Sequence, residues 1–384
     1  MTMRIKNPFI INGYVSSEYF CDRVNETATL TSALTNGRNM VIVSPRRMGK
    51  TGLIQHCFSQ NNIANEYYTF FIDIYATGSM KEFVYILGKH IFNTLKPKGI
   101  SILEQFFASI SSLRPAFKLE PITGEPVFDI GIGDIRQPEL SIEEIFKYLE
   151  TADKPCLVAI DEFQQIAKYP EKNVEAILRT HIQKCTNTAF VFSGSQRHMM
   201  QNIFFSASRP FYQSAAFMNL DAISEDVYCS FVRQHFENGC KKISEECIRH
   251  IYEFFEGHTW YMQTIFNRLF ENTDRKETMT LENADRILKQ TINANETVYQ
   301  NLVVMLSERQ KEILFAIAKE GCATEITSTA FIKKHGLNSP SSVQSATKQL
   351  LDKEFITKDG NVYRVYDRFF GLWLAQIYGI GYKL

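Results

Sequence analysis

A short run of residues that could hold phosphate lies near the N-terminus. Residues 44–51 match the pattern G-x-x-x-x-G-K-[ST] at every position except the first, where Ser44 replaces glycine. The run follows an apolar stretch, residues 39–43, and precedes an amphipathic helical pattern over residues 51–59. Backbone N–H groups at the start of a helix have no intrahelical partner and can bind an anion. The spacing therefore predicts a phosphate-binding loop that opens a helix.

The residue types in this loop suit nucleotide chemistry. Gly49 allows close backbone approach, Lys50 could reach the β- and γ-phosphates and assist catalysis, and the Thr51 hydroxyl could ligate Mg²⁺. The two arginines add positive charge beside the loop, or are ordinary solvated side chains. The expected nucleotide-binding loop comprises Ser44, Pro45, Arg46, Arg47, Met48, Gly49, Lys50 and Thr51.

A second candidate element is the apolar run 156–160, which ends in Asp161 and Glu162. If this run is a strand beside the loop, Asp161 lies at the carboxyl edge of the sheet and can hold Mg²⁺ through water. Glu162 can polarise the attacking water. The alternative is a strand that happens to end in acidic turn residues, and the upstream loop favours the catalytic interpretation.

Further polar residues could complete the site. Ser193 and Ser195 follow the next apolar run, residues 189–192, and could sense the γ-phosphate, or could form a simple turn. Arg197 and Arg209 lie beyond them and could approach the phosphates. His258 could reach the nucleotide from a later helical region, or could be a capping or core histidine.

The surrounding pattern indicates an α/β architecture. Short apolar runs separated by helical patterns predict a parallel sheet that is covered on both faces. Prolines interrupt the pattern around residues 113–139, which we interpret as an insertion with a hairpin. The expected strands cover residues 39–43, 67–74, 156–160, 189–192 and 216–220.

The second half of the chain is predicted to be largely helical. Four helical patterns between residues 225 and 292 suggest an α-helical region over 221–304, after an ATPase-like core over 1–220. Residues 305–384 then show three helical patterns and two short extended pieces joined by an Asp-Gly turn at 359–360. This order is that of a winged helix-turn-helix.

Composition limits the class of protein. The 384 residues carry 42 basic and 42 acidic side chains, which argues against a protein that coats nucleic acid with uniform positive charge. The eight cysteines form no CxxC pair, and no segment is long and apolar enough to span a bilayer. The N-terminus shows no signal peptide, so we expect a soluble cytoplasmic protein without membrane contact.

With these motifs in view, the chain resembles the archaeal-type P-loop ATPases, in the STAND branch of the AAA-like ATPases. The likeness rests on residues 7–9, 20–23, 45–51, 160–162, 194–195, 257–258 and 366–374. It implies an ASCE-type core with five strands, a helical lid and a winged helix. The resemblance also implies that ATP and Mg are the cofactors. It implies that the adenine ring packs near residues 20–23, so Arg23 is added to the expected nucleotide-binding residues. Thr259 stands where the family's lid motif usually has proline.

Two classes of function remain open at this stage. The chain could be a slow ATPase that acts as a nucleotide-controlled switch. It could instead be a DNA-binding regulator, or a defence or signalling protein with a protein partner, whose nucleotide site is mainly structural. The winged region has eleven basic and eight acidic residues, a modest net +3 for DNA contact. Its candidate DNA contacts are Ser342, Gln344, Ser345, Lys348 and Lys358.

Overall fold

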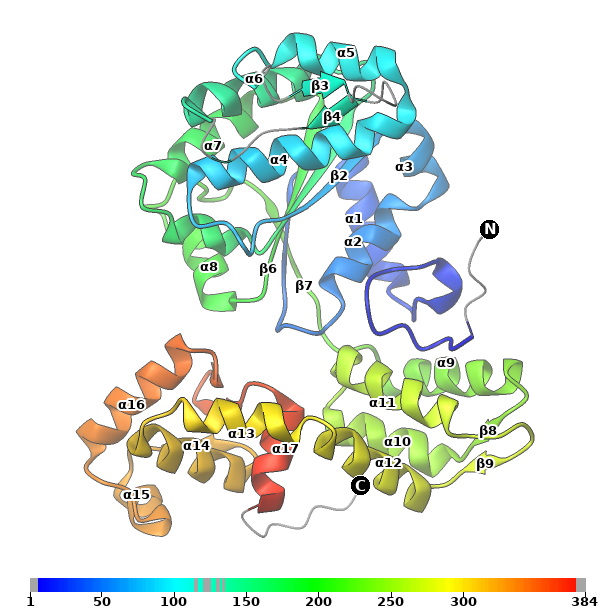
Figure 1. The fold of residues 1–384 in the computed structure, drawn as a ribbon, viewed down its shortest axis with the longest axis vertical. Coiled ribbons are helices and arrows are strands. Elements are labelled where there is room, and N and C mark those ends of the chain that lie inside the picture. The colour runs from blue at the N-terminus through cyan, green and yellow to red at the C-terminus, as the bar shows by residue number, and fades with distance from the viewer. Residues whose placement is uncertain (1–5, 114–116, 120–125, 129–131, 133–134, 378–384) are drawn as a thin grey trace. The chain divides into compact units, whose positions relative to one another are not determined.

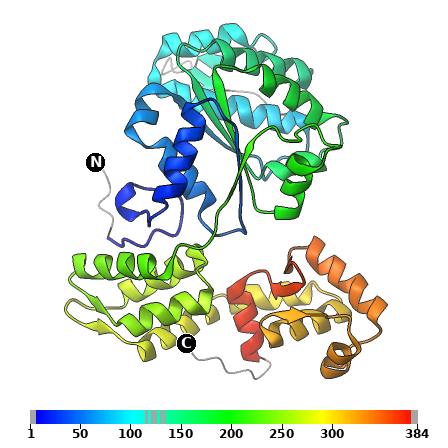
Figure 2. The same ribbon diagram turned by 180° about the vertical axis from the view of Figure 1, so that it is seen from behind.

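The computed structural model describes residues 6–113, 117–119, 126–128, 132 and 135–377. These residues form two compact units (Figures 1 and 2). The first comprises residues 12–223, and the second combines residues 6–11 with residues 224–377. Among the described helices, none has both the length and the apolar composition needed to cross a membrane.

The first unit is built on a five-stranded parallel sheet in the order β2-β5-β6-β1-β7. The strand β1, which leads into the phosphate loop, therefore lies between β6 and β7. The strand that ends in Asp161 is β5, and β6 separates it from β1. The strands are β1 (Met40–Val43), β2 (Tyr68–Asp73), β5 (Cys156–Asp161), β6 (Thr188–Gly194) and β7 (Ala216–Asn219). The predicted five-strand parallel sheet is confirmed.

Helices cover both faces of this sheet, as Figures 1 and 2 show. Alternate residues of β1 face opposite sides, so Ile42 packs in one hydrophobic core and Val41 in the other. Burial on both faces explains why the strands are continuously apolar rather than alternating. One face packs against α1 (Val24–Thr35), α2 (Lys50–Phe58) and α3 (Asn61–Glu66); the other packs against α4 (Met80–Leu95), α5 (Ile100–Ser109), α6 (Pro138–Thr151), α7 (Val174–Lys184) and α8 (Arg197–Phe205).

The predicted insertion carries a short antiparallel hairpin, as expected. Its strands are β3 (Phe117–Leu119) and β4 (Pro126–Phe128). Phe128 packs near Phe92 of α4, with ring centroids 5.7 Å apart, so the hairpin lies against the helical layer. The remainder of the insertion, at residues 114–116, 120–125, 129–131 and 133–134, falls outside the described residues.

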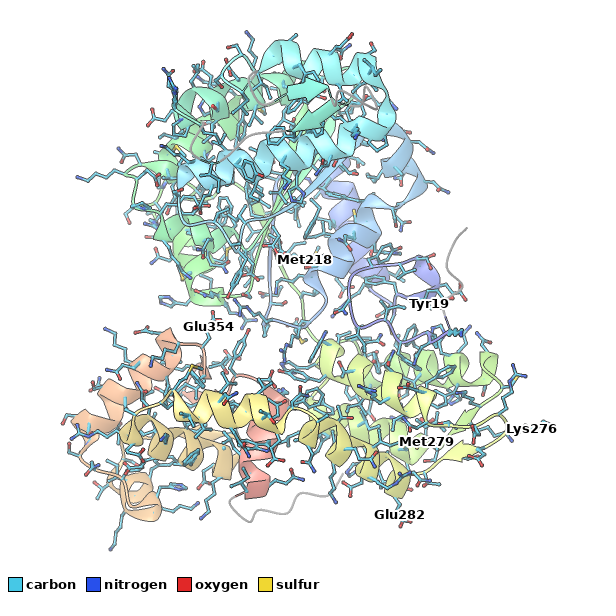
Figure 3. The ribbon with its side chains drawn as sticks, viewed as in Figure 1. Tyr19, Met218, Lys276, Met279, Glu282 and Glu354 are labelled. Carbon is cyan, nitrogen blue, oxygen red and sulfur yellow. The ribbon has the colours of Figure 1, made fainter. Side chains whose placement is uncertain are left out.

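The second unit begins with a helical subdomain that also takes in the start of the chain. Phe9 is fully buried among the rings of α9 (Glu225–Asn238) and α11 (Thr259–Glu271). Its ring centroid lies 5.8 Å from that of Phe236 and 5.7 Å from that of Phe266. Two short parallel strands, β8 (Lys242–Ile243) and β9 (Thr278–Met279), interrupt the helices. Strands therefore occur within residues 221–304, a region that the sequence predicted to be helical. Met279 of β9 is buried, whereas Lys276 and Glu282 on either side are exposed (Figure 3). The helices are α9 (Glu225–Asn238), α10 (Glu245–Phe255), α11 (Thr259–Glu271) and α12 (Leu281–Asn293).

The rest of the second unit is the predicted winged helix. The strands β11 (Ile356–Asp359) and β12 (Val362–Val365) form the wing, with Asp359 opposite Val362 and Gly360 at a φ of 58° in the turn. The third strand of this sheet, β10 (Ala323–Thr324), could not be predicted from the sequence, because two residues carry no periodic pattern. The helices are α13 (Glu296–Val304), α14 (Glu308–Glu320), α15 (Thr329–His335), α16 (Pro340–Asp352) and α17 (Arg368–Ile377).

Candidate functional site

The phosphate loop connects β1 to α2 at the carboxyl end of the sheet. Gly49 is the N-cap of α2 with a φ of 91°, and Arg47 also has a positive φ of 69°. A Cβ atom built on Gly49 would meet no heavy atom within 4 Å, so its backbone conformation, not crowding, requires glycine here. The first N–H groups of α2 lack intrahelical partners and therefore offer donors to an anion.

The Lys50 side chain is buried within this loop. Its ammonium group donates to Ser44 O at 3.0 Å, to Ser44 Oγ at 3.3 Å and to Pro45 O at 3.2 Å. Burial lowers the pKa of Lys50, while the nearby carboxylates of Asp161 and Glu162 oppose that shift. Three neutral oxygens thus hold a desolvated ammonium group that an anionic ligand would stabilise. Ser44 serves this loop through both its carbonyl and its hydroxyl.

Asp161 lies between the phosphate loop and the end of β6. Its Oδ2 accepts a hydrogen bond from Thr51 Oγ1 at 2.9 Å, and its Oδ1 accepts one from Ser193 Oγ at 2.6 Å. The Asp161 carboxylate is buried, and these bonds fix its orientation. The structure thus brings together the predicted metal ligands Thr51 and Asp161 with Ser193.

Glu162 follows at the strand end in a left-handed backbone conformation, with a φ of 57°. Its Oε2 accepts a hydrogen bond from Ser195 Oγ at 2.8 Å, and Ser195 Oγ in turn accepts one from Arg46 Nε at 3.2 Å. Arg46 also lies over the Tyr75 ring, 5.1 Å from its centroid. A positive φ at a non-glycine residue costs about 1–3 kcal/mol and is typical of functional sites.

One acidic residue at this sheet edge was missed. Asp73 ends β2 and pairs in register with Asp161, which places a third carboxylate at the same edge as Glu162. Burial raises the pKa of Asp73, and the charges of Asp161 and Glu162 raise it further. The signal in the sequence was weak, because Asp73 lies within the apolar run 67–74 and Ile74 follows it.

Arg23 is a structural tie beside the loop. Only 4% of it is exposed, and its guanidinium group pairs with Glu26 at 2.7 Å and donates to Asp221 O at 2.6 Å and to Met48 O at 3.5 Å. It therefore joins the start of α1 to the loop and to the end of β7. Its role in holding nucleotide remains an expectation from the resemblance.

An aromatic group lies near Arg23, around the segment where the resemblance places adenine. Phe20 stacks on His56 of α2 with centroids 4.4 Å apart, and a Cβ atom on Gly52 would lie 3.3 Å from the Phe20 ring. Tyr14 completes the group through a 2.9 Å hydrogen bond between its hydroxyl and His56 Nδ1. Gly52 thus allows Phe20 to lie directly against α2.

Two other residues considered for the site have structural partners. Arg209 pairs with the buried Glu175 at 2.7 Å. His258 belongs to the second unit, where it is the N-cap of α11 and its Nδ1 lies 3.1 Å from Phe255 O. Burial, together with the positive charge of Arg368, lowers the pKa of His258 to about 4. Arg197 is the first residue of α8.

The candidate DNA contacts occupy the winged helix. Gln344, Ser345 and Lys348 are exposed along α16, and Lys358 is exposed on the wing, where its ammonium group lies 5.3 Å from the centroid of Tyr363. Ser342 is partly buried in the first turn of α16, and its N–H donates to Ser339 Oγ. These side chains provide polar groups on one helix and one wing.

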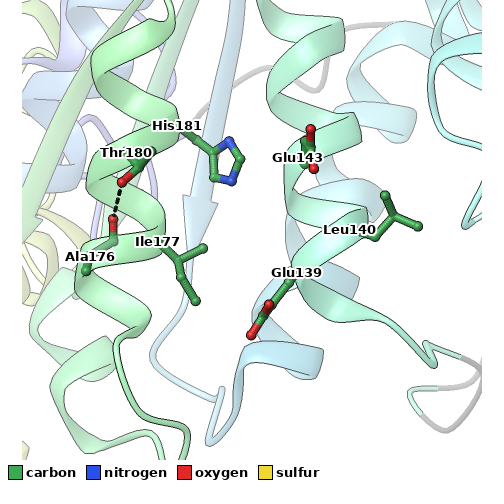
Figure 4. A pocket seen from close by; sticks show the side chains of 7 residues that line it. All are labelled: Glu139, Leu140, Glu143, Ala176, Ile177, Thr180 and His181. Atoms are coloured by element: carbon green, nitrogen blue, oxygen red, sulfur yellow. Dashed lines mark hydrogen bonds between the residues drawn. The ribbon is translucent and has the colours of Figure 1, made fainter.

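A separate groove of about 450 Å³ lies between α6 and α7 (Figure 4). None of the predicted site residues lines it. The His181 ring packs 5.5 Å from the Phe146 ring, and burial lowers the pKa of His181. The groove therefore has no share in the phosphate-loop site.

The phosphate-loop residues fit a magnesium nucleotide. Among the described residues, no three or more His, Cys, Asp or Glu side chains gather as a metal cage. Mg²⁺ does not need such a cage, because it usually keeps several waters and takes one or two protein oxygens together with substrate phosphates. Thr51 and Asp161 supply that type of oxygen pair, and Lys50 supplies the matching positive charge.

The sheet order, the loop and the acidic strand end together define a P-loop NTPase with a helical region and a C-terminal winged helix. Residues 20–265 match the family described as "ATPase domain predominantly from Archaea", so the chain belongs to that family. Residues 297–376 match a "Probable winged helix domain". Among curated proteins, none matches the chain in sequence.

Solved structures share this fold. The Walker-type ATPase of Pyrococcus abyssi is 17% identical with a TM-score of 0.64, and the match covers 96% of this chain and 99% of the other. The ORC2 protein of Aeropyrum pernix, in its ADPNP–ADP complexes, is 12% identical with a TM-score of 0.56, and the match covers 97% and 98%. The likeness therefore extends over both units at the level of fold.

Proposed function

We propose that this protein binds ATP and is a slow, Mg²⁺-dependent ATPase that acts as a nucleotide-controlled switch. The observation that carries the proposal is the buried Lys50 ammonium group in a loop whose next residue, Thr51, is bonded to Asp161. The A. pernix ORC2 protein with the same fold is described with ADPNP and ADP. A nucleotide in this loop would give Lys50 the anionic partner that burial favours.

The roles of the side chains follow from this arrangement. Lys50 and the N–H groups of α2 would hold the phosphates, with Ser44–Met48 forming the rest of the loop. Thr51 and Asp161 would hold Mg²⁺, which supplies charge stabilisation at the phosphates. Glu162 would orient and deprotonate the attacking water, while Ser193 and Ser195 link the strand ends to these carboxylates.

Slow turnover is supported by the structural contacts of two arginines, Arg23 and Arg209. An arginine that stabilises transferring phosphate typically speeds hydrolysis by a factor of about 10³ to 10⁵. Arg209 is paired with Glu175, and Arg23 with Glu26 and the Asp221 carbonyl. Neither is placed as a mobile guanidinium group for the γ-phosphate.

The switch role is supported by contacts within the second unit. Glu256, beside His258, accepts hydrogen bonds from Arg364 of the wing at 3.1 Å and from Arg368 of α17 at 2.7 Å. The Tyr261 hydroxyl accepts a hydrogen bond from Arg368 N at 3.0 Å. A lid movement would therefore carry the winged helix with it. For such coupling, ATP must bind the two arrangements with different affinity.

The test is ATP hydrolysis and binding by the full chain and two variants. Lys50→Ala should weaken ATP binding by about tenfold or more, because it removes a charge-assisted contact to phosphate. Glu162→Gln keeps the side-chain shape but removes the base, so it should retain binding and lose about 100-fold or more in turnover. Turnover in both variants equal to that of the unaltered chain would refute the proposal.

The second candidate function is DNA binding through the winged helix. The exposed Gln344, Ser345 and Lys348 on α16 favour it, because these side-chain types contact bases and phosphates. A contact mediated by phosphates must weaken steeply as salt rises. If the chain binds no DNA duplex even at low salt, a protein partner is favoured instead.

A further inference from the structure

Gln164 is a buried side chain that contacts the proposed catalytic base. It lies in the short 3-10 helix Phe163–Lys168 that follows β5, and only 2% of it is exposed. Its Nε2 donates a hydrogen bond to Glu162 Oε2. Since only the amide nitrogen can donate to a carboxylate, the chemistry fixes the orientation of the amide.

The backbone of β6 makes room for this side chain. Gly194 carries no positive φ, so its conformation does not call for glycine. A Cβ atom at Gly194 would instead collide with Gln164 Oε1, and would lie 2.6 Å from Met200 Sδ. The glycine therefore allows the Gln164 amide to lie across the end of β6 and reach Glu162.

The neighbouring side chain Phe163 anchors the turn from the other side. Its ring is fully buried and lies 4.6 Å from Phe192 and 5.3 Å from Phe211, measured between centroids. With Phe163 locked in the core, Gln164 is held beside Gly194. The geometry is therefore set by packing rather than by a mobile loop.

We propose that Gln164 is a positioning residue that fixes the rotamer of Glu162 for water activation. Glycine at position 194 leaves the space that the Gln164 side chain needs. This inference rests on the proposed ATPase function. Gln164 and Ser195 both donate to Oε2 of Glu162, so the other oxygen, Oε1, is the one left to accept from the attacking water. Gln164 acts through Glu162 and touches no phosphate.

A purely structural role is disfavoured by the other end of the amide. Among the described residues, none donates a hydrogen bond to Gln164 Oε1, which is buried. A buried acceptor without a partner costs stability, so this end of the amide offsets part of what the hydrogen bond to Glu162 contributes. The amide is thus only partly satisfied, and the hydrogen bond that it does donate ends on the proposed base rather than on a backbone group of the core.

The experiment compares Gln164→Met with the matched control Gln165→Met in the full chain. Methionine keeps the length of the side chain but removes the donor, and Gln165 donates to the Thr77 carbonyl at 2.8 Å, not to Glu162. For Gln164→Met we expect kcat to fall by about tenfold or more, since a hydrogen bond to a charged group is lost. The dissociation constant for Mg·ATP should stay unchanged, and the thermal midpoint should change no more than it does in Gln165→Met. Gln165→Met should leave kcat unaltered.

A second variant tests the same contact without altering the glutamine. Gly194→Ala should lower kcat by displacing Gln164. In a Gln164→Ala background the added methyl group still meets the flexible Met200 side chain, but it should lower kcat much less than it does in the unaltered chain. Additive losses would overturn the proposal, and so would unaltered kcat in Gln164→Met, or a fall in kcat that accompanies lost nucleotide binding. If Glu162→Gln turns over as fast as the unaltered chain, the proposed function fails first. If Glu162→Gln is inactive while Gln164→Met is fully active, only this inference fails.

Discussion

The Thr51 hydroxyl donates a 2.9 Å hydrogen bond to Asp161 Oδ2, across 110 positions of sequence. This bond joins the first turn of α2 to the carboxyl end of β5. It brings two oxygen ligands of the type that Mg²⁺ prefers to within contact distance. The proposed metal chemistry depends on this pair, and it can be tested directly.

Asp161→Ala should weaken Mg·ATP binding by about 10- to 100-fold, the usual effect of losing a group that supports a bound metal. It should change the affinity for ATP in the presence of a chelator much less, because Lys50 and the loop remain. Calorimetric titration with and without Mg²⁺ measures both constants. Equal affinities of the variant and the unaltered chain for Mg·ATP would contradict the assignment.

Arg209→Ala should destabilise the first unit by about 2 kcal/mol. It leaves the Glu175 side chain, which is 11% exposed, without its ion-pair partner, and breaking a partly buried pair costs more than breaking a surface pair. Urea unfolding followed by circular dichroism measures the loss. The matched double variant Glu175→Gln with Arg209→Ala should recover part of it, since no buried charge is left alone. A double variant at least as unstable as the sum of the single variants would contradict this account.

The second unit should become more stable as pH rises from about 4 to 6.5. The ordinary pKa of histidine is 6.5, and burial beside Arg368 lowers the pKa of His258 to about 4. Between these values the unfolded chain binds the proton and the folded chain does not, so acid favours unfolding. The contribution of His258 is fully present above pH 6.5 and is lost as pH falls toward 4, with a slope of at most about 1.4 kcal/mol per pH unit.

Fluorescence of the two tryptophans, Trp260 and Trp373, reports this transition, since both lie in the second unit. Glu256 pairs with Arg364 and Arg368 beside the histidine. Burial raises the pKa of Glu256, but the two arginines lower it more, so the net pKa lies below the ordinary value of 4.5. The stability that Glu256 contributes is therefore lost only when the pH falls below about 4.5. His258→Asn should therefore remove the slope between pH 5 and 6.5. An unaltered slope in that range would assign it to other groups.

If the switch proposal holds, binding of a DNA duplex or a protein partner should differ among the ATP-analogue, ADP and nucleotide-free states. Lys50→Ala should abolish the difference, because it weakens the nucleotide contact without touching α16. Lys348→Ala should weaken DNA binding. It should also reduce, by about one, the slope of the logarithm of the binding constant against the logarithm of the salt concentration, because one phosphate contact is lost. Identical binding in all three nucleotide states would leave the winged helix as an independent module.

Most of the candidate site could be predicted because it is local in sequence. The loop 44–51, and the acidic pair after residue 160, are recognisable since phosphate and metal chemistry demand particular residue types at fixed spacing. The five strands were also predictable, because strands buried on both faces are continuously apolar. For several helices, only the structure gave the first and last residues. These helices are α1, α6, α7, α8, α13 and α17.

The sequence determined the class of protein: a phosphate loop, an acidic strand end and a winged helix. Tertiary structure decided how these parts meet. It placed Asp73 beside Asp161, engaged Arg23 and Arg209 in structural contacts, and brought Gln164 onto Glu162 over Gly194. It also packed Phe9 with α9 and α11, far along the chain. Such relationships depend on strand order and packing between distant segments, which no spacing within one segment encodes.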